Sequence, residues 1–338
     1  MEPVDAVKLV YQSAFGCGHL LSGDCAGRVE EELAHVAACG DVPALTPIGG
    51  GMCRLNLAAP AVRELPPERI AGMMRVTMAQ SLGGEAAMAA GLEALRELAR
   101  AGETPFSEES LEAFLGDWDG RTPVSHSAAY RLAYAPAYRV VREDLGTLVP
   151  AAAEIERRLS EEGRALAVLD GPCGSGKSTL ADALAALYHT RPIRMDDFFL
   201  PPAMRTAERL RQPGGNVHYE RFRDEVLAGL MRGGDVVYRR YDCQSGAWVD
   251  RLHRAAPVAV IEGSYSHHPA FAQAYAALGA LRVYVHTAEE ERIKRLRMRE
   301  GERFFTFQTR WIPLEKSYIE AYDIKSGADI ALESQPWA

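Results

Sequence analysis

The sequence is poor in lysine, in closely spaced cysteines and in long apolar runs. Five lysines stand against 33 arginines, so a lysine that lies inside a motif is more informative than usual. No stretch reaches the roughly 18 apolar residues that a membrane-spanning helix needs. The first ten residues include Glu2 and Asp5 and hold no long apolar run, which argues against a signal peptide. We therefore expect a cytoplasmic protein that does not act on membranes.

Disulfides and nucleic-acid binding are also disfavoured. No two of the six cysteines form a C-x-x-C pair, which favours reduced thiols over a disulfide framework. The net charge of −8 argues against a nucleic-acid partner, which usually requires a basic surface. Hydrophobic residues make up 47% and charged residues 25%, as in soluble globular proteins, and 338 residues suggest two domains.

Residues 1–149 have mainly helical patterns. We expect helices over 28–38, after Pro66-Pro67, over 85–100 and after Ser107, with a turn at Gly49-Gly50-Gly51. We interpret this region as a helical accessory domain, which could bind an acceptor, mediate homo-oligomerisation or sense a regulator. Cys17, His19 and Cys25 match no zinc spacing, so a structural role is favoured there. His126 beside Ser125 and Ser127 has no identifiable acid partner, which disfavours nucleophilic catalysis.

Residues 150–338 alternate strands with helices. After a helix from Pro150 to Glu162, we expect strands over 165–169, 193–195, 258–261 and 281–286, and a further strand over 236–241. Helices are expected over 178–188, 219–231 and 289–299. This alternation predicts an α/β domain, with a parallel sheet covered by helices on both faces.

One motif in this domain is specific. The run GPCGSGKS, residues 171–178, fits the Walker A pattern G-x-x-x-x-G-K-[ST] between an apolar strand and a helix. Its glycines let backbone N–H groups turn toward phosphate oxygens, and the following helix presents its positive end to the same anion. Lys177 can reach the β- and γ-phosphates, and the Ser178 hydroxyl can ligate Mg²⁺. The motif therefore predicts an ATP site formed by Gly171, Cys173, Gly174, Ser175, Gly176, Lys177, Ser178 and Thr179.

Further elements narrow the type of P-loop protein. Residues 196–199 read DDFF, residues 261–263 read IEG, and an arginine-rich helix follows over 292–300. In this order they resemble the uridine kinase-like branch of P-loop kinases, which includes uridine, nicotinamide riboside and phosphoribulose kinases. The resemblance covers the chain from about Arg164 onward. It implies a P-loop fold and phosphorylation of a small-molecule hydroxyl by ATP and Mg²⁺.

The resemblance also implies roles for two carboxylates. The first aspartate of the DDFF run, Asp196, corresponds to the base that accepts the proton of the acceptor hydroxyl. Asp197 is the alternative, with a capping role favoured for it. Glu262, at the end of an apolar strand, suits Mg²⁺ or a water bound to Mg²⁺. An ordinary carboxylate at the end of a strand is the other interpretation.

The arginine-rich helix resembles the lid of these kinases, where arginines close over ATP and stabilise the transferring phosphoryl group. Arg292, Arg295 and Arg299 fall on one helical face at i, i+3 and i+7. Spacing does not decide which of them acts, and a solvated basic face is the alternative.

The acceptor side departs from the family. Tyr241-Asp242 resembles its acceptor-holding Y-D element, but the later histidine is missing. His218 lies where uridine kinases have a ribose-binding aspartate, so uridine itself is in doubt. A structural role for His218 is the other interpretation. Trp311 to Glu315, with Tyr318 and Tyr322, resembles the tail of bacterial uridine kinase-like proteins, and packing against the sheet is its expected role.

The sequence thus favours an ATP-dependent kinase for a nucleoside or sugar-like alcohol. The alternative is a nucleotide-dependent regulatory ATPase that acts through residues 1–149. Asp196 favours the kinase, since a switch needs no base for an organic hydroxyl.

Overall fold

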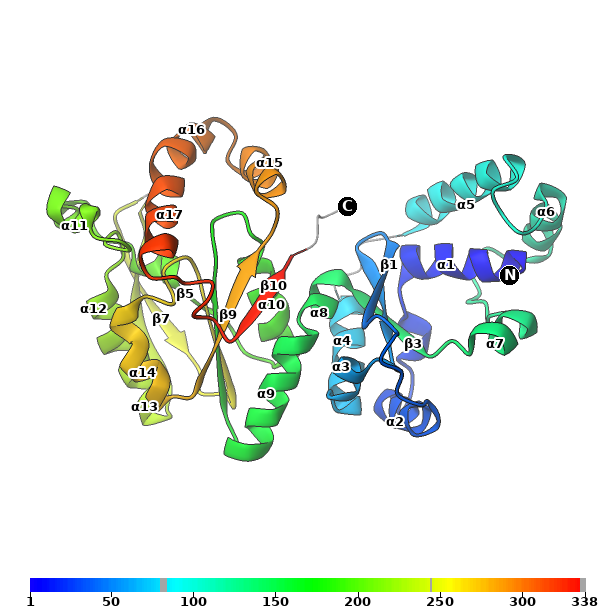
Figure 1. Ribbon diagram of the computed structural model, residues 1–338, viewed down its shortest axis with the longest axis horizontal. Helices are drawn as coiled ribbons and strands as arrows, with labels where there is room; N and C mark the ends of the chain where they lie inside the picture. The colour runs from blue at the N-terminus through cyan, green and yellow to red at the C-terminus, as the bar shows by residue number, and fades with distance from the viewer. Residues whose placement is uncertain (80–83, 244, 335–338) are drawn as a thin grey trace. The chain divides into compact units, whose positions relative to one another are not determined.

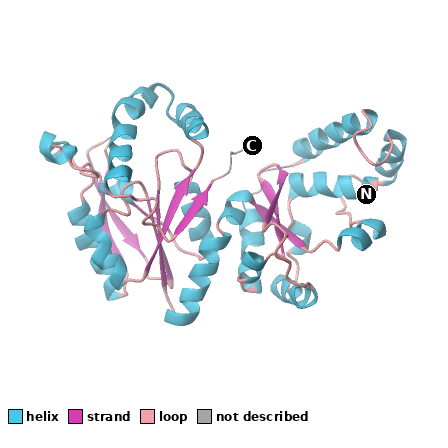
Figure 2. Cartoon of the chain, viewed as in Figure 1, coloured by secondary structure: helices cyan, strands magenta, loops and turns pink. Residues whose placement is uncertain are grey.

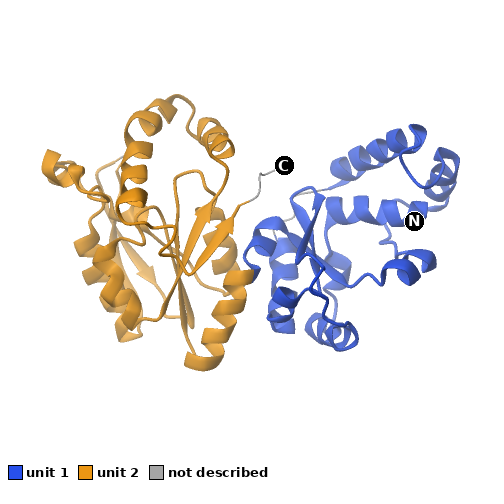
Figure 3. Cartoon of the chain, viewed as in Figure 1, with its two compact units in different colours: residues 1–149, 337–338 blue, residues 150–336 orange. Residues whose placement is uncertain are grey.

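The computed structural model describes residues 1–79, 84–243 and 245–334. The chain divides into two compact units, one of residues 1–149 and one that begins at Pro150 (Figure 3). Each unit is described by itself. No described helix is long and apolar enough to cross a membrane.

The first unit is built mainly from helices. They are α1 Pro3–Phe15, α2 Cys25–His35, α3 Pro60–Arg63, α4 Pro67–Ala79, α5 Glu85–Arg100, α6 Glu108–Asp117, α7 Ala128–Tyr134 and α8 Glu143–Thr147. The expected helix over 85–100 is α5, and Ser107 caps α6 by accepting from the N–H of Ser110. Apolar side chains of α1, α5 and α6 pack into one core, which includes Val7, Leu95 and Leu111.

The first unit also contains a small sheet that the sequence analysis did not anticipate. Strands β1 Leu45–Gly49, β2 Met52–Asn56 and β3 Tyr138–Arg142 pair antiparallel in that order. The expected turn at Gly49-Gly50-Gly51 joins β1 to β2, and all three glycines have positive φ, a conformation that glycine adopts without strain. The third strand comes some 80 residues after the second. Local patterns do not reveal such a distant partner.

The second unit contains the predicted parallel sheet. Strands β4 Ala165–Asp170, β5 Ile193–Arg194, β8 Val258–Glu262, β9 Ala280–His286 and β10 Ile330–Glu333 lie in the order β10-β9-β4-β8-β5. Every neighbouring pair is parallel. Helices α9 Val149–Glu162 and α10 Lys177–Leu187 lie on one face, and α13 Ala228–Arg232 and α14 Ala272–Ala277 on the other (Figures 1 and 2). This confirms the predicted α/β fold with both faces of the sheet covered.

The parallel sheet brings the ends of several strands to one edge. All six residues of the central strand β4 are buried, as expected for a strand covered on both faces. Leu169 of β4 and Arg194 of β5 are both register partners of Glu262 at the end of β8. The segments that follow β4, β5 and β8 therefore begin side by side, and they carry the phosphate loop, Asp196 and Glu262.

Two expected elements differ from their predictions. The strand predicted over 236–241 exists as β6 Val236–Tyr241, but it forms an antiparallel hairpin with β7 Trp248–His253 outside the parallel sheet. The single helix predicted over 219–231 consists of α12 Tyr219–Arg221, a π-helical segment Phe222–Leu227 and α13. The remaining helices of this unit are α11 Ala207–Arg211, α15 Glu289–Glu300, α16 Phe304–Thr306 and α17 Ile312–Ala321.

Candidate active site

The site is built around the loop between β4 and α10. Gly171, Gly174 and Gly176 have φ values of +151°, +79° and +89°, which side chains other than glycine rarely adopt. A Cβ atom at Gly171 would lie 2.1 Å from the carbonyl oxygen of Val285. Glycine is therefore required here by both conformation and space, as the phosphate-loop interpretation predicts.

The loop has two buried polar side chains, those of Ser175 and Lys177. The hydrogen bond that Lys177 Nζ donates to a described residue is a long one, of 3.4 Å, to the carbonyl of Pro172. The Ser175 hydroxyl is buried without a hydrogen-bond partner among the described residues. A lysine with a weak partner at the positive end of α10 fits an anion such as a nucleotide phosphate. Thr179, also expected in the ATP site, is exposed on the first turn of α10.

Cys173 is a structural part of this loop. Its thiol is buried, and burial is the main cause that raises its pKa to about 12, with the nearby carboxylate of Glu315 acting in the same direction. The thiol therefore stays protonated near neutral pH and is not a nucleophile.

The metal-binding prediction concerns Ser178 and Glu262. The Ser178 hydroxyl donates a 3.0 Å hydrogen bond to Oε2 of Glu262, and Arg194 Nη1 lies 2.6 Å from Oε1. Burial raises the pKa of Glu262, while Lys177 and Arg194 oppose that shift. A hydroxyl and a carboxylate oxygen this close fit Mg²⁺, which prefers oxygen ligands. The sequence analysis did not include Arg194, which also bonds Asp182.

The two adjacent aspartates have different surroundings. Asp196 is exposed, yet the surrounding protein desolvates its carboxylate enough to raise its pKa, against the opposing charge of Lys177. Among the described residues, no side chain forms a hydrogen bond or ion pair with Asp196. Asp197 is buried, accepts a 3.2 Å hydrogen bond from the Tyr238 hydroxyl and pairs with Arg240 at 3.5 Å. This leaves Asp196 accessible to a substrate and engages Asp197 with the β6–β7 hairpin.

The three arginines of α15 also differ. Arg292 is buried, and its Nη1 donates to the carbonyl oxygen of Cys173 at 3.2 Å. Arg295 Nη1 donates to Ser334 Oγ at 2.9 Å, and that hydroxyl donates to the Ser175 carbonyl at 2.6 Å. Arg299 is exposed and pairs with the neighbouring Glu300. Two of the three therefore contact the phosphate loop or a residue bonded to it.

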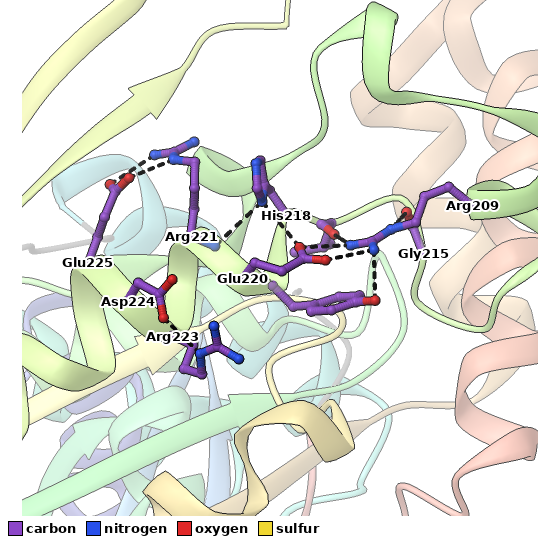
Figure 4. A network of polar contacts seen from close by, with 10 residues as sticks. Arg209, Gly215, His218, Glu220, Arg221, Arg223, Asp224 and Glu225 are labelled. Carbon is purple, nitrogen blue, oxygen red and sulfur yellow. Dashed lines mark hydrogen bonds and ion pairs between the residues drawn. The ribbon is translucent and has the colours of Figure 1, made fainter.

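On the expected acceptor side, His218 is engaged locally. Its Nδ1 lies 3.2 Å from Glu220 and accepts a long 3.4 Å bond from the N–H of Arg221, which caps α12 (Figure 4). Arg209 holds the same segment, because it forms two hydrogen bonds to Glu220 and reaches the backbone carbonyls of Gly215 and Val217 (Figure 4). These contacts support the structural interpretation of His218.

The Y-D element lies at the end of the hairpin. Tyr241 is buried against Trp248, with ring centroids 5.0 Å apart. Asp242 bonds the N–H of Ser245 at 3.1 Å and the side chain of Arg240 at 3.3 Å, so it shapes the turn between β6 and β7. Asn216, two residues before His218, is buried, and neither atom of its amide group forms a hydrogen bond to a described residue.

Glu315 is the site residue that the sequence analysis missed. Its Oε2 accepts a 2.9 Å hydrogen bond from the N–H of Cys173, and Ser264 Oγ lies 2.8 Å from its Oε1. The tail around Trp311 was expected only to pack against the sheet. Its nearby Tyr318 does so, since it is fully buried and donates a 2.8 Å bond to Asp170 at the end of β4.

The first unit holds a different polar cluster. His126 Nδ1 lies 3.1 Å from Asp5, and its Nε2 lies 2.6 Å from the Tyr138 hydroxyl, so the histidine does have an acid partner. The Ser127 hydroxyl donates to Asp5 at 2.8 Å and caps α7, and it is not bonded to the histidine. This geometry is that of a buried structural network. Among residues 1–79, 84–243 and 245–334, no group of three or more His, Cys, Asp and Glu could hold a metal ion.

Two of the solved structures similar to this chain are kinases by their names. A possible uridine kinase from Bacillus stearothermophilus shares 18% identity at a TM-score of 0.39, over 53% of this chain and 99% of its own. A candidate fructose transport system kinase from Silicibacter sp. TM1040 shares 22% identity at a TM-score of 0.36, over 50% of this chain and 89% of its own. No protein-family model matches the sequence, and no curated protein is significantly similar to it.

Proposed function

We propose that the second unit transfers the γ-phosphoryl group of ATP to a hydroxyl of a small-molecule acceptor, such as a nucleoside or a sugar-like alcohol. One observation carries this proposal. Lys177, the Ser178–Glu262 pair and the unpaired Asp196 all lie on segments at the same edge of the parallel sheet. Phosphoryl transfer to an organic hydroxyl needs a site for the phosphates and a base for the hydroxyl. An anion-binding loop with an exposed carboxylate beside it can supply both.

Each side chain has a part in the proposed reaction. The loop N–H groups and Lys177 hold the phosphates, and Ser178 with Glu262 would hold Mg²⁺, which neutralises charge on the phosphates when bound. Asp196 orients the acceptor hydroxyl and takes its proton, for which a raised pKa makes the carboxylate a better base. Arg292, fixed at Cys173, stabilises charge on the transferring group.

We include a cytoplasmic location and a role without nucleic acid or membranes in the proposal. All six cysteines are free thiols, which agrees with a reducing compartment.

The test is ADP release from ATP and Mg²⁺ with a panel of nucleosides, vitamins and sugars, each compared with a reaction that lacks acceptor. The Lys177→Ala variant should lose acceptor-dependent ADP release, since it lacks the positively charged side chain that binds the phosphates. Lys316→Ala is the matched control, because Lys316 is exposed and pairs only weakly with Glu320 at 3.9 Å. One acceptor that stimulates release and gains the mass of a phosphoryl group would support the kinase. Equal release with and without every acceptor would favour the regulatory ATPase.

A further inference from the structure

The carboxylate of Glu315 is buried against the phosphate loop. Oε2 accepts from the N–H of Cys173 at 2.9 Å, and Oε1 lies 2.8 Å from the hydroxyl of Ser264, which also lies 3.1 Å from the carbonyl of Gly171. Glu315 is 7% exposed. A buried carboxylate is costly unless it is hydrogen-bonded, and a bond from a backbone N–H to a charged oxygen is among the stronger kinds. The hydrogen bond between Glu315 and Cys173 therefore holds the phosphate loop against α17.

The helix α17 is fixed so that Glu315 reaches the loop. Tyr318 follows Glu315 by three residues, so the two side chains share a helix face. The Tyr318 hydroxyl donates to Oδ2 of Asp170, whose Oδ1 accepts from the N–H of Gly171 at 2.6 Å. One face of α17 thus contacts both the end of β4 and the loop that follows it.

Glu315 also acts on Asp196 through its charge. Desolvation by the surrounding protein is the main cause that raises the pKa of Asp196, and the negative charge of Glu315 adds to this, while Lys177 acts against it. The charged or titratable groups that act on Asp196 or are acted on by it are Lys177 of α10, Arg194 of β5, Asp197, Cys243 after β6, Glu262 of β8 and Glu315 of α17. Of the carboxylates among these, Glu315 alone is bonded to the phosphate loop's own backbone.

We propose that Glu315 is a positioning residue for phosphoryl transfer, which anchors the phosphate loop at Cys173 and supplies a negative charge that acts on Asp196. This inference rests on the proposed function. Glu315 does not touch the reacting atoms in it, since both of its oxygens are occupied by protein donors. Its effect reaches the reaction through the loop on one side and through the base on the other.

Two variants separate the anchor from the charge. Glu315→Gln keeps an oxygen that can accept from Cys173 but removes the charge, so it should bind nucleotide within about threefold of the wild type. Its kcat should fall about tenfold, and the acid limb of its pH–rate profile should move to lower pH by on the order of one unit. Glu315→Ala also removes the anchor and should weaken ADP binding about tenfold or more. Glu320→Gln and Glu320→Ala are the controls, because Glu320 lies on the same helix and is exposed.

The outcomes are distinct. A Glu315→Gln enzyme with the wild-type kcat and acid limb would overturn the charge part of the inference, and it does so even if Glu315→Ala fails to fold. If the wild type phosphorylates no acceptor, the proposed function fails, and ADP binding then decides the anchor alone. If circular dichroism shows that Glu315→Ala and Glu320→Ala are both folded, equal ADP affinity of the two variants would overturn the anchoring role of Glu315. If Glu315→Ala does not fold, the ADP affinity of Glu315→Asp is measured in its place. The shorter aspartate side chain cannot reach Cys173 and Ser264 together. Wild-type ADP affinity of this variant would again overturn the proposed anchoring of the loop.

Discussion

Glu262 is shared between Ser178 and Arg194, each of which bonds one of its two carboxylate oxygens, at 3.0 and 2.6 Å. The sharing has a consequence for metal binding. Ser178 and Glu262 are the residues that would hold a Mg²⁺ ion, and Arg194 limits rotation of the Glu262 carboxylate because it bonds one of its oxygens. Arg194 is itself held by Asp182, so the orientation of Glu262 depends on three segments of the chain.

We expect Glu262→Gln to lower the transfer rate about a hundredfold or more at ordinary Mg²⁺ concentrations, because the amide is a poor Mg²⁺ ligand. Excess Mg²⁺ should restore part of the rate. Rates measured against Mg²⁺ concentration would show this as a raised half-saturating value. Glu302→Gln, at an exposed position, serves as the control. A variant with the wild-type Mg²⁺ dependence would contradict the metal role of Glu262.

Replacement by asparagine should affect catalysis at Asp196 and stability at Asp197. Asp196→Asn removes the proposed base and should reduce kcat by about 10² to 10⁴, with folding unchanged, since Asp196 is exposed. Asp197→Asn should keep kcat within a few-fold but lose about 1–3 kcal/mol of stability, because it weakens buried bonds to Tyr238 and Arg240. Steady-state kinetics and thermal unfolding of both variants check this, and a reversed pattern would assign the base to Asp197.

The structure predicts different contributions to kcat from Arg292 and Arg299 of α15, which their spacing in the sequence could not distinguish. Arg292→Gln should reduce kcat about a hundredfold, since Arg292 is buried against Cys173 at the phosphate loop. Arg299→Gln should change kcat less than about threefold, because Arg299 is exposed and pairs with Glu300. Kinetics at saturating ATP compare the two variants directly. A larger loss for Arg299→Gln would mean that the lid closes in a way that brings Arg299 to the phosphates.

The parts of the site that could be predicted from the sequence are those that depend on local order. The phosphate loop is contiguous, and its glycines, Lys177 and Ser178 act through their own backbone and the following helix. Asp196 and Glu262 could be placed because each follows a buried strand, and parallel strands bring their carboxyl ends to one edge. That argument needs only strand patterns and a general rule of α/β folds.

The contacts that were missed join residues far apart in the chain. Glu315 and Cys173 are separated by 142 positions, and nothing in either local sequence specifies the other. Strand β3 pairs with β2 across more than 80 residues, and the partner of His126 is Asp5, 121 positions away. Such pairs follow from tertiary packing. A carboxylate that shares a helix face with an aromatic residue, as Glu315 does with Tyr318, is the signal that could have drawn attention to the tail.

The Asp5 cluster should matter for stability in the first unit. Asp5 accepts bonds from the backbone N–H groups of Glu2 and Ser127 and from the Ser127 hydroxyl, and its pKa is lowered by these bonds against the opposing effect of burial. Asp5→Asn should therefore cost about 1–3 kcal/mol. Thermal unfolding measures the loss, with Asp41→Asn as an exposed control. Transfer kinetics should not change, and a variant as stable as the control would contradict this role for the cluster.

The partly buried His267 should make the protein less stable in mild acid. Burial lowers the pKa of His267, whose Nε2 lies 3.0 Å from the Val168 carbonyl, below the value of about 6.5 that it has in the unfolded chain. The unfolded chain therefore binds a proton at this residue before the folded protein does. Stability is fully present above pH 6.5 and is lost as the pH falls below it, by up to about 1.4 kcal/mol per pH unit.

The unfolding temperature should consequently drop between pH 7.5 and pH 5.5, and it should drop less in His267→Gln, which keeps a donor for Val168 but has no proton to gain. His35→Gln is the control, because His35 is exposed and should leave the wild-type drop unchanged. Burial raises the pKa values of Asp197 and Glu262, and these groups oppose the trend because the folded protein takes up their protons first. The comparison between the two histidine variants removes that contribution, since both retain the same carboxylates. An equal drop in both variants would contradict the lowered pKa of His267 in the folded protein.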